Sequence, residues 1–75
     1  MKGLLEFLAR QLVDHPDQVI VRELEGERSI ILELQVAPED MGKVIGRQGK
    51  TAQAIRTLVK AAGLREGKRV MVEII

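Results

Sequence analysis

Residues 42–55 contain the pattern with the clearest chemical meaning: Gly-Lys-Val-Ile-Gly-Arg-Gln-Gly-Lys-Thr-Ala-Gln-Ala-Ile. Gly46 and Gly49 enclose Arg47 and Gln48, and Lys50 follows directly. Because glycine has no Cβ, a phosphate group can approach the main chain of such a turn closely. The main-chain N–H groups that open a following helix point toward a bound anion. The spacing therefore predicts a turn between two helices that binds the backbone of single-stranded nucleic acid.

Basic residues are concentrated around this turn. Residues 43–69 hold eight basic residues and one acidic residue, a net charge of +7, whereas residues 1–42 hold four basic and nine acidic residues, a net charge of −5. A polyanion is attracted to the positive segment even though the whole chain carries only +1. A basic run is often an ordinary solvated surface, but its overlap with the glycine turn favours nucleic-acid binding.

The glycine turn has two other interpretations. Gly49-Lys50-Thr51 resembles the end of a P-loop, but that motif requires glycine where this chain has Val44, and it requires a preceding strand. The two glycines could also form a plain turn between helices. The polar, cationic tip made by Arg47 and Gln48 favours a binding turn over both.

The first half of the chain predicts a helix and a hairpin. Apolar residues at helical spacing indicate a helix over residues 2–13, with Leu5, Leu8, Leu12 and Phe7 on its buried stripe. Residues 18–25 and 28–36 are rich in branched side chains and predict two antiparallel strands. The turn at 26–27 between them is short, as in a hairpin.

The second half predicts two helices and a final strand. Pro38 begins a short helix that runs to about Ile45, where Gly46 stops it. A second helix spans 50–62 and is capped by Gly63, and a strand spans 69–75. The expected buried stripe of the second helix consists of Ile55, Leu58, Val59 and Ala62.

The resulting order, helix–strand–strand–helix–helix–strand, predicts one α+β domain over residues 1–75. A helical crossover precedes the last strand, and such a connection favours parallel pairing. We therefore expect a three-stranded mixed sheet with three helices on one face.

Composition argues against several classes of protein. There is no cysteine, no apolar run near the ~20 residues of a membrane span, and no signal-peptide pattern. His15 is the only histidine, which favours a surface or capping role, and Glu39 and Asp40 suit a helix start. No nucleophile–base pair or metal-ligand cluster is evident. We expect a cytoplasmic, non-catalytic protein without a cofactor or metal.

With these elements around it, the segment Val44-Ile45-Gly46-Arg47-Gln48-Gly49 resembles the loop of type II KH domains. The resemblance covers essentially the whole chain and extends to small bacterial KH proteins of the KhpA type. It implies a groove that holds about four nucleotides of single-stranded RNA or DNA. It also implies that main-chain groups of the strand at 28–36 read base edges, and that the acidic loop at 25–27 borders the groove.

The residues expected to contact RNA lie in the loop, in the short helix before it and on the helix after it. They are Lys43, Val44, Ile45, Gly46, Arg47, Gln48, Gly49, Lys50, Thr51, Gln53 and Arg56.

The resemblance implies a post-transcriptional regulator or RNA chaperone. A single aromatic residue and the small Ala52 predict weak binding by one copy, so we expect a dimer. The expected partners are a second copy, a larger KH-containing protein of the KhpB (Jag) type, or both. The alternative is a protein-interaction module that dimerises with that larger protein and makes little RNA contact.

Overall fold

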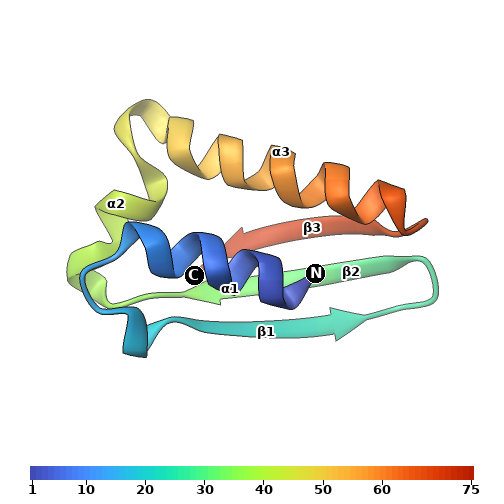
Figure 1. Cartoon of the computed structure of the whole chain (residues 1–75), viewed down its shortest axis with the longest axis horizontal. Coiled ribbons are helices and arrows are strands. Elements are labelled where there is room, and N and C mark those ends of the chain that lie inside the picture. Colours follow the sequence, from blue (N-terminus) through green and yellow to red (C-terminus); the bar gives the residue numbers. More distant parts are fainter.

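Three strands form one mixed sheet, and two long helices lie across one of its faces (Figure 1). The computed structural model describes all residues from 1 to 75. The elements in chain order are α1 (Lys2–Leu12), β1 (Ile20–Glu25), β2 (Ser29–Gln35), α2 (Met41–Ile45), α3 (Lys50–Arg65) and β3 (Arg69–Ile74). Single 3₁₀ turns at Pro16–Gln18 and Pro38–Asp40 and a non-helical turn at Arg47–Gly49 lie in the connections.

The sheet has β2 in its centre. β1 pairs antiparallel with β2, as the short turn between them predicts, and β3 pairs parallel with β2 after the crossover through α2 and α3. The order of elements, the mixed sheet and the α+β class are as predicted. β1 and β3 are consequently the two edges, and β3 is the edge beside α3 (Figure 1).

The core lies between this sheet and the helices. Alternate residues of β2 face it, because successive side chains of a strand point to opposite faces. It contains thirteen buried apolar residues: Leu5, Ala9, Val19, Val21, Ile30, Leu32, Leu34, Val36, Val44, Ile55, Val59, Val70 and Val72.

Three residues predicted to be buried are on the surface. Phe7 is 59% exposed, Leu58 is 54% exposed and Leu12 is 37% exposed. The buried stripe of α3 instead runs through Ala52, Ile55, Val59 and Gly63. Both helices are more apolar than one buried face requires, so helical spacing alone did not identify the side that packs.

The prediction that Gly63 caps α3 was wrong. Gly63 is buried inside the helix, which continues to Arg65, and a Cβ on it would collide with the side chain of Val70. Gly67 provides the left-handed residue (φ 72°) that ends the helix. The N–H groups of Gly67 and Lys68 bond to the carbonyl oxygens of Leu64 (3.1 Å) and Gly63 (2.9 Å), which is a Schellman motif.

None of the helices combines the length and the apolar character that crossing a membrane requires.

Candidate nucleic-acid interface

The loop between α2 and α3 has an unusual backbone. Gly46, Gln48 and Gly49 all have positive φ, at 76°, 57° and 74°. The N–H of Gly46 closes α2 on the carbonyl of Gly42 (2.9 Å), and the N–H of Gly49 bonds to the carbonyl of Gly46 (3.1 Å). Positive φ strongly favours glycine, so the two glycines make this sharp reversal possible.

Each glycine is required for a different reason. A Cβ on Gly46 would collide with the side chain of Thr51 and lie 2.9 Å from its main-chain nitrogen. A Cβ on Gly49 would meet nothing within 4 Å, so only the backbone conformation favours glycine there. Thr51 therefore packs against the bare α-carbon of Gly46 and locks the loop onto the first turn of α3.

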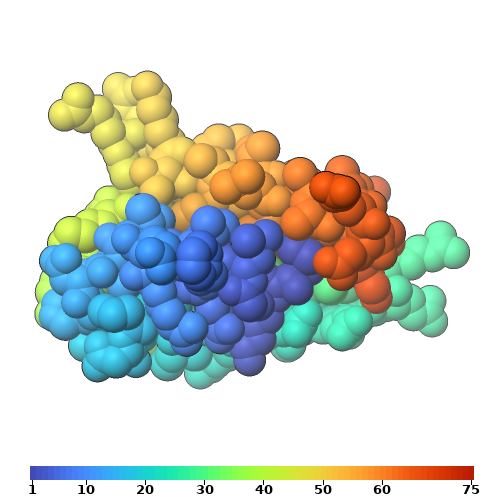
Figure 2. Space-filling view, in the orientation of Figure 1, coloured from blue at the N-terminus to red at the C-terminus, as the bar shows by residue number.

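The loop presents hydrogen-bond donors and positive charge. No side chain caps the amino end of α3, although its first N–H groups lack partners within the helix. Arg47, Gln48 and Lys50 are exposed around that helix end. In Figure 2 the yellow segment that contains the loop projects from the body of the molecule. This arrangement suits an anion such as a phosphate.

A groove lies between α3 and the edge strand β3. One hollow of about 160 Å³ is lined by Arg56 and Lys60 of α3 and by Val70, Met71 and Val72 of β3. A second of about 450 Å³ continues past Lys60 and Met71 to Leu64 and Arg69. Arg56 lies seven residues after Gly49, roughly 10 Å along α3.

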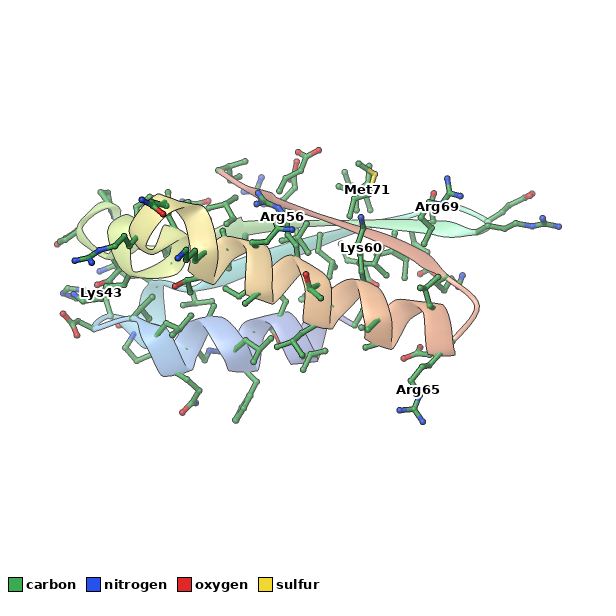
Figure 3. All side chains as sticks on the ribbon, turned by 90° about the horizontal axis from the view of Figure 1, so that it is seen from above. Lys43, Arg56, Lys60, Arg65, Arg69 and Met71 are labelled. Carbon is green, nitrogen blue, oxygen red and sulfur yellow. The ribbon has the colours of Figure 1, made fainter.

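The groove has an apolar floor and a basic rim. Figure 3 shows Arg56, Lys60, Arg69 and Met71 on the same side of α3 and β3, whereas Arg65 points away. The Nε of Arg56 donates to the carbonyl of Val72 at 3.3 Å, which holds this cation beside the strand edge. Lys60 and Arg69 are groove residues that the predicted site lacked. Two features of the sequence could have identified them. Both residues lie in the +7 segment, and Lys60 follows Arg56 at the helical i, i+4 spacing.

Several predicted site residues do lie together. The structure places Gly46, Arg47, Gln48, Gly49 and Lys50 in or beside the loop, with Thr51 beneath it. Gln53 is exposed on the next turn of α3, and Arg56 is half-buried in the groove.

Two predicted contacts have other surroundings. Val44 is completely buried in the core, so it anchors α2 and offers no surface, while its neighbour Ile45 is half-buried. The ammonium of Lys43 lies 2.6 Å from Asp14 Oδ2, a hydrogen bond that raises the pKa of the lysine. Figure 3 shows Lys43 at the α2 end, apart from the groove cations.

The expectation that β2 reads base edges was wrong. β2 is paired on both sides, with β1 and with β3, so its main-chain groups are used within the sheet. The outer edge of β3 is the strand edge in the groove. The acidic hairpin at 25–27 and the glycine loop lie at opposite ends of the long axis (Figure 1), and Lys68 Nζ lies 3.2 Å from Glu25 Oε2.

A buried carboxylate underlies α2. Asp40, in the 3₁₀ turn before α2, is fully buried and accepts main-chain N–H groups from Asp14 (3.2 Å) and His15 (3.0 Å). His15 Nδ1 also lies 3.0 Å from Asp40 Oδ2, and this hydrogen bond raises the pKa of His15. Burial opposes ionisation of Asp40, but these hydrogen bonds outweigh it and lower the pKa of Asp40.

Comparison with known proteins identifies relatives along the entire chain. The family model described as KhpA/KhpB, KH domain, matches residues 2–74. Proteins named RNA-binding protein KhpA from Clostridium acetobutylicum and Caldanaerobacter subterraneus subsp. tengcongensis are 68% and 67% identical over 75 residues, covering 100% of both chains. The protein of the same name from Aquifex aeolicus is 48% identical and is covered over 95% of its length.

A solved structure shares the fold. The crystal structure of a point variant of Aquifex aeolicus Era bound to GDP·AlF4⁻ superposes with a TM-score of 0.71 over 97% of this chain, at 19% identity. This chain spans 28% of that Era chain, so the likeness concerns the fold of one part of it. The match to the family model and the full-length relatives together establish that the chain belongs to the KhpA/KhpB family of KH-domain proteins.

Proposed function

We propose that this protein binds single-stranded RNA, with phosphates held at the Gly46–Gly49 loop and bases placed over the groove between α3 and β3. The observation that carries the proposal is the uncapped, positively charged amino end of α3, the helix whose later turns line that groove. Membership of the KH family and the printed name of the relatives, RNA-binding protein KhpA, support it. In this function the protein acts as a post-transcriptional regulator or RNA chaperone.

The two parts of the site perform different tasks. The loop binds phosphate through main-chain N–H groups and the charges of Arg47 and Lys50, which is independent of base sequence. The exposed apolar side chains of the groove are Met71 and Leu64, which offer a surface for bases, whereas Val70 and Val72 behind them are buried in the core. Stacking on aromatic rings adds about 1–3 kcal/mol per base where it occurs. This groove has no aromatic lining residue, so one copy binds weakly.

The loop is tested by the double substitution of Arg47 and Gln48 with aspartate. Two negative charges at the phosphate site should abolish binding of a fluorescein-labelled single-stranded oligouridylate in an anisotropy titration. The fold should persist, because both side chains are exposed.

A matched control is available in α1. Arg10 and Gln11 are also an exposed Arg-Gln pair, and their substitution with aspartate changes the net charge by the same amount. Equal loss of binding in both variants would point to net charge alone and reject the loop as the RNA site.

A second candidate function is favoured by exposed apolar side chains on the helices. The only aromatic residue, Phe7, and also Leu58 and Leu64 are more than half exposed. α1 and α3 are in contact, so Phe7 and Leu58 belong to one helical layer. We propose that this layer binds a second copy of the chain, or a larger KH-containing protein of the KhpB type, because a small domain gains stability and avidity from association.

Light scattering on paired variants tests this assembly. Leu58→Glu should shift the chain from dimer to monomer, because a carboxylate would have to be buried at the contact. Leu24→Glu places the same change on the open face of the sheet, where Leu24 is equally exposed, and should leave the dimer intact. Loss of the dimer only in the Leu24 variant would indicate that the interface lies on the open face of the sheet and not on the helical layer. A dimer of wild type that never crosslinks to RNA would favour the protein-interaction function.

A further inference from the structure

Asp40 is the only buried polar side chain of the protein, with 0% exposure. A buried carboxylate is costly unless hydrogen bonds compensate for the lost water. Here both oxygens are used, Oδ1 by the N–H of Asp14 and Oδ2 by the N–H and the imidazole of His15. The α1–β1 connection is therefore bonded to the residue that precedes α2.

This connection matters because α2 is too short to hold itself. A helix of five residues is unstable alone and depends on its neighbours. Its one buried side chain is Val44, and its carboxyl end becomes the glycine loop. Asp40 is its anchor at the amino end, six residues before Gly46.

Lys43 connects the next turn of α2 to the same residues, and we call Asp14, His15, Asp40 and Lys43 the Asp40 cluster. Its ammonium lies 2.6 Å from Asp14 Oδ2 and 3.7 Å from Asp40 Oδ1. Residues separated by 25 to 29 positions in the chain thus meet at the base of α2. Asp40, directly before α2, and Lys43, within α2, are both held against one segment, which restricts both the position and the tilt of the helix.

We propose that Asp40 is a positioning residue for the glycine loop: with His15 and Lys43 it sets the orientation of α2 and so the direction in which the Gly46–Gly49 main chain faces. The part of this inference that concerns RNA rests on the proposed function. Because His15 is a member of the cluster, the position of the loop responds to pH.

The direction of that response follows from the charges around His15. The imidazole, 41% exposed, faces Asp40, Asp14 and Glu39, and Lys43 supplies a positive charge against the same carboxylates. The hydrogen bond to Asp40 raises the pKa of His15 above its usual 6.5, and burial opposes the rise. Because the pKa of His15 is higher in the folded state than in the unfolded state, protonated His15 stabilises the fold. This stabilisation is complete below the pKa of the unfolded state and is lost as the pH rises through the pKa of the folded state.

Asp40 sets the acidic limit of the same window. Folding lowers the pKa of Asp40 below its usual 3.8. The stability that the ionised carboxylate contributes is therefore present above pH 3.8 and is lost only as the pH falls through the lower pKa of the folded state. The cluster is therefore tightest between these limits, in mildly acidic solution, and loosens as His15 loses its proton.

The first experiment follows the loop without RNA. Amide ¹H–¹⁵N resonances of Gly46 and Gly49 are recorded from about pH 5 to 8.5 and compared with the titration of the His15 ring. We expect both amides to shift with the midpoint of the ring in wild type and to stay constant in His15→Gln. The introduced glutamine preserves a polar side chain but does not titrate in this range. Gly67, which also has positive φ but lies in the α3–β3 connection, serves as an internal control.

The second experiment measures affinity for a fluorescein-labelled single-stranded oligouridylate at the same pH values. Wild type should bind about threefold more weakly at about pH 8 than at about pH 6, a size typical of coupling through packed networks. His15→Gln should lack this change. The variant retains every other ionisable group, so any slope left in the variant comes from groups other than His15.

Asp40→Asn provides an additional comparison. It keeps the volume of the side chain but replaces one acceptor with a donor that faces an N–H group. If the variant folds, its loop amides should be displaced at every pH and should no longer follow the His15 ring. The inference stands without this variant, because His15→Gln leaves both main-chain hydrogen bonds to Asp40 in place.

The outcomes separate this inference from the proposed function. Loop amides that ignore pH in wild type, or that titrate equally in His15→Gln, overturn the positioning role even if RNA binds at the loop. Loop amides that titrate with His15 in a protein that does not bind RNA support the positioning role and reject the proposed function.

Discussion

Gly46 and Gly49 differ in what a side chain would encounter. Gly46 has φ 76° and ψ 174°, a region open essentially to glycine alone, and Thr51 occupies the space of a Cβ. Gly49 has φ 74° and ψ 12°, a left-handed conformation that asparagine also tolerates, and the space around it is open. In this motif, packing against Thr51 therefore requires glycine at position 46, whereas at position 49 only the backbone conformation favours glycine.

Substitutions at the two glycines should therefore have unequal effects. Gly46→Ala adds backbone strain and a steric clash and should lower the free energy of unfolding by about 3 kcal/mol. Gly49→Asn should cost about 1 kcal/mol or less. Urea unfolding followed by circular dichroism measures both. Equal losses would mean that Thr51 does not constrain the loop.

Among the elements, α3 does most to shape the site. Its amino end faces the loop, one side carries Arg56 and Lys60 into the groove, and the adjacent side packs on the core. The close approach of α3 to β3 depends on Gly63, whose bare α-carbon faces Val70.

Gly63→Ala should destabilise the protein by about 1–3 kcal/mol through overpacking, although alanine is the better helix former by about 1 kcal/mol. The same variant should widen the groove and weaken RNA binding. Gly3→Ala is the matched control, since Gly3 is also helical but has nothing within 4 Å of a Cβ. It should leave stability unchanged or raise it slightly. Thermal unfolding of both variants checks the prediction, and a stabilised Gly63→Ala would contradict it.

At the scale of the whole molecule, charge is divided between two regions. The extents are 35 × 23 × 17 Å, longer than the Debye length of about 8 Å at physiological ionic strength, so the two regions act separately in solution. The loop and groove carry Arg47, Lys50, Arg56 and Lys60, whereas at the other end Glu25 of the hairpin is paired with Lys68.

Binding of single-stranded RNA should consequently depend steeply on salt. About four neutralised phosphates predict a slope of about 3 when the logarithm of Kd is plotted against that of the salt concentration. Lys60→Gln should lower this slope by about 0.7, the value for one phosphate contact. Lys43→Gln should leave the slope nearly unchanged, because Asp14 already pairs with that lysine. Anisotropy titrations at several salt concentrations measure the slopes. A larger decrease of the slope in Lys43→Gln than in Lys60→Gln would indicate that Lys43 contacts RNA.

Local sequence by itself determined the order of elements, the hairpin, the parallel crossover and the glycine loop. These features depend on neighbours a few residues apart, through strand alternation, turn chemistry and the steric freedom of glycine. Element ends shifted by a few residues, and Gly63 was misassigned because a glycine near a helix end resembles a cap until its packing against Val70 is known.

Only the tertiary structure decided which surface lies on the same side of the molecule as the groove residues of α3, namely the edge strand β3. The groove exists because β3 lies at the edge of the sheet beside α3, a placement that also removes β2 from the site. Phe7 could be placed outside the core, and Asp40 inside it, only once long-range neighbours were known, since the partners of Asp40 lie 25 and 26 residues away. Burial and ion pairing are properties of what the whole chain brings together, so no local pattern specifies them.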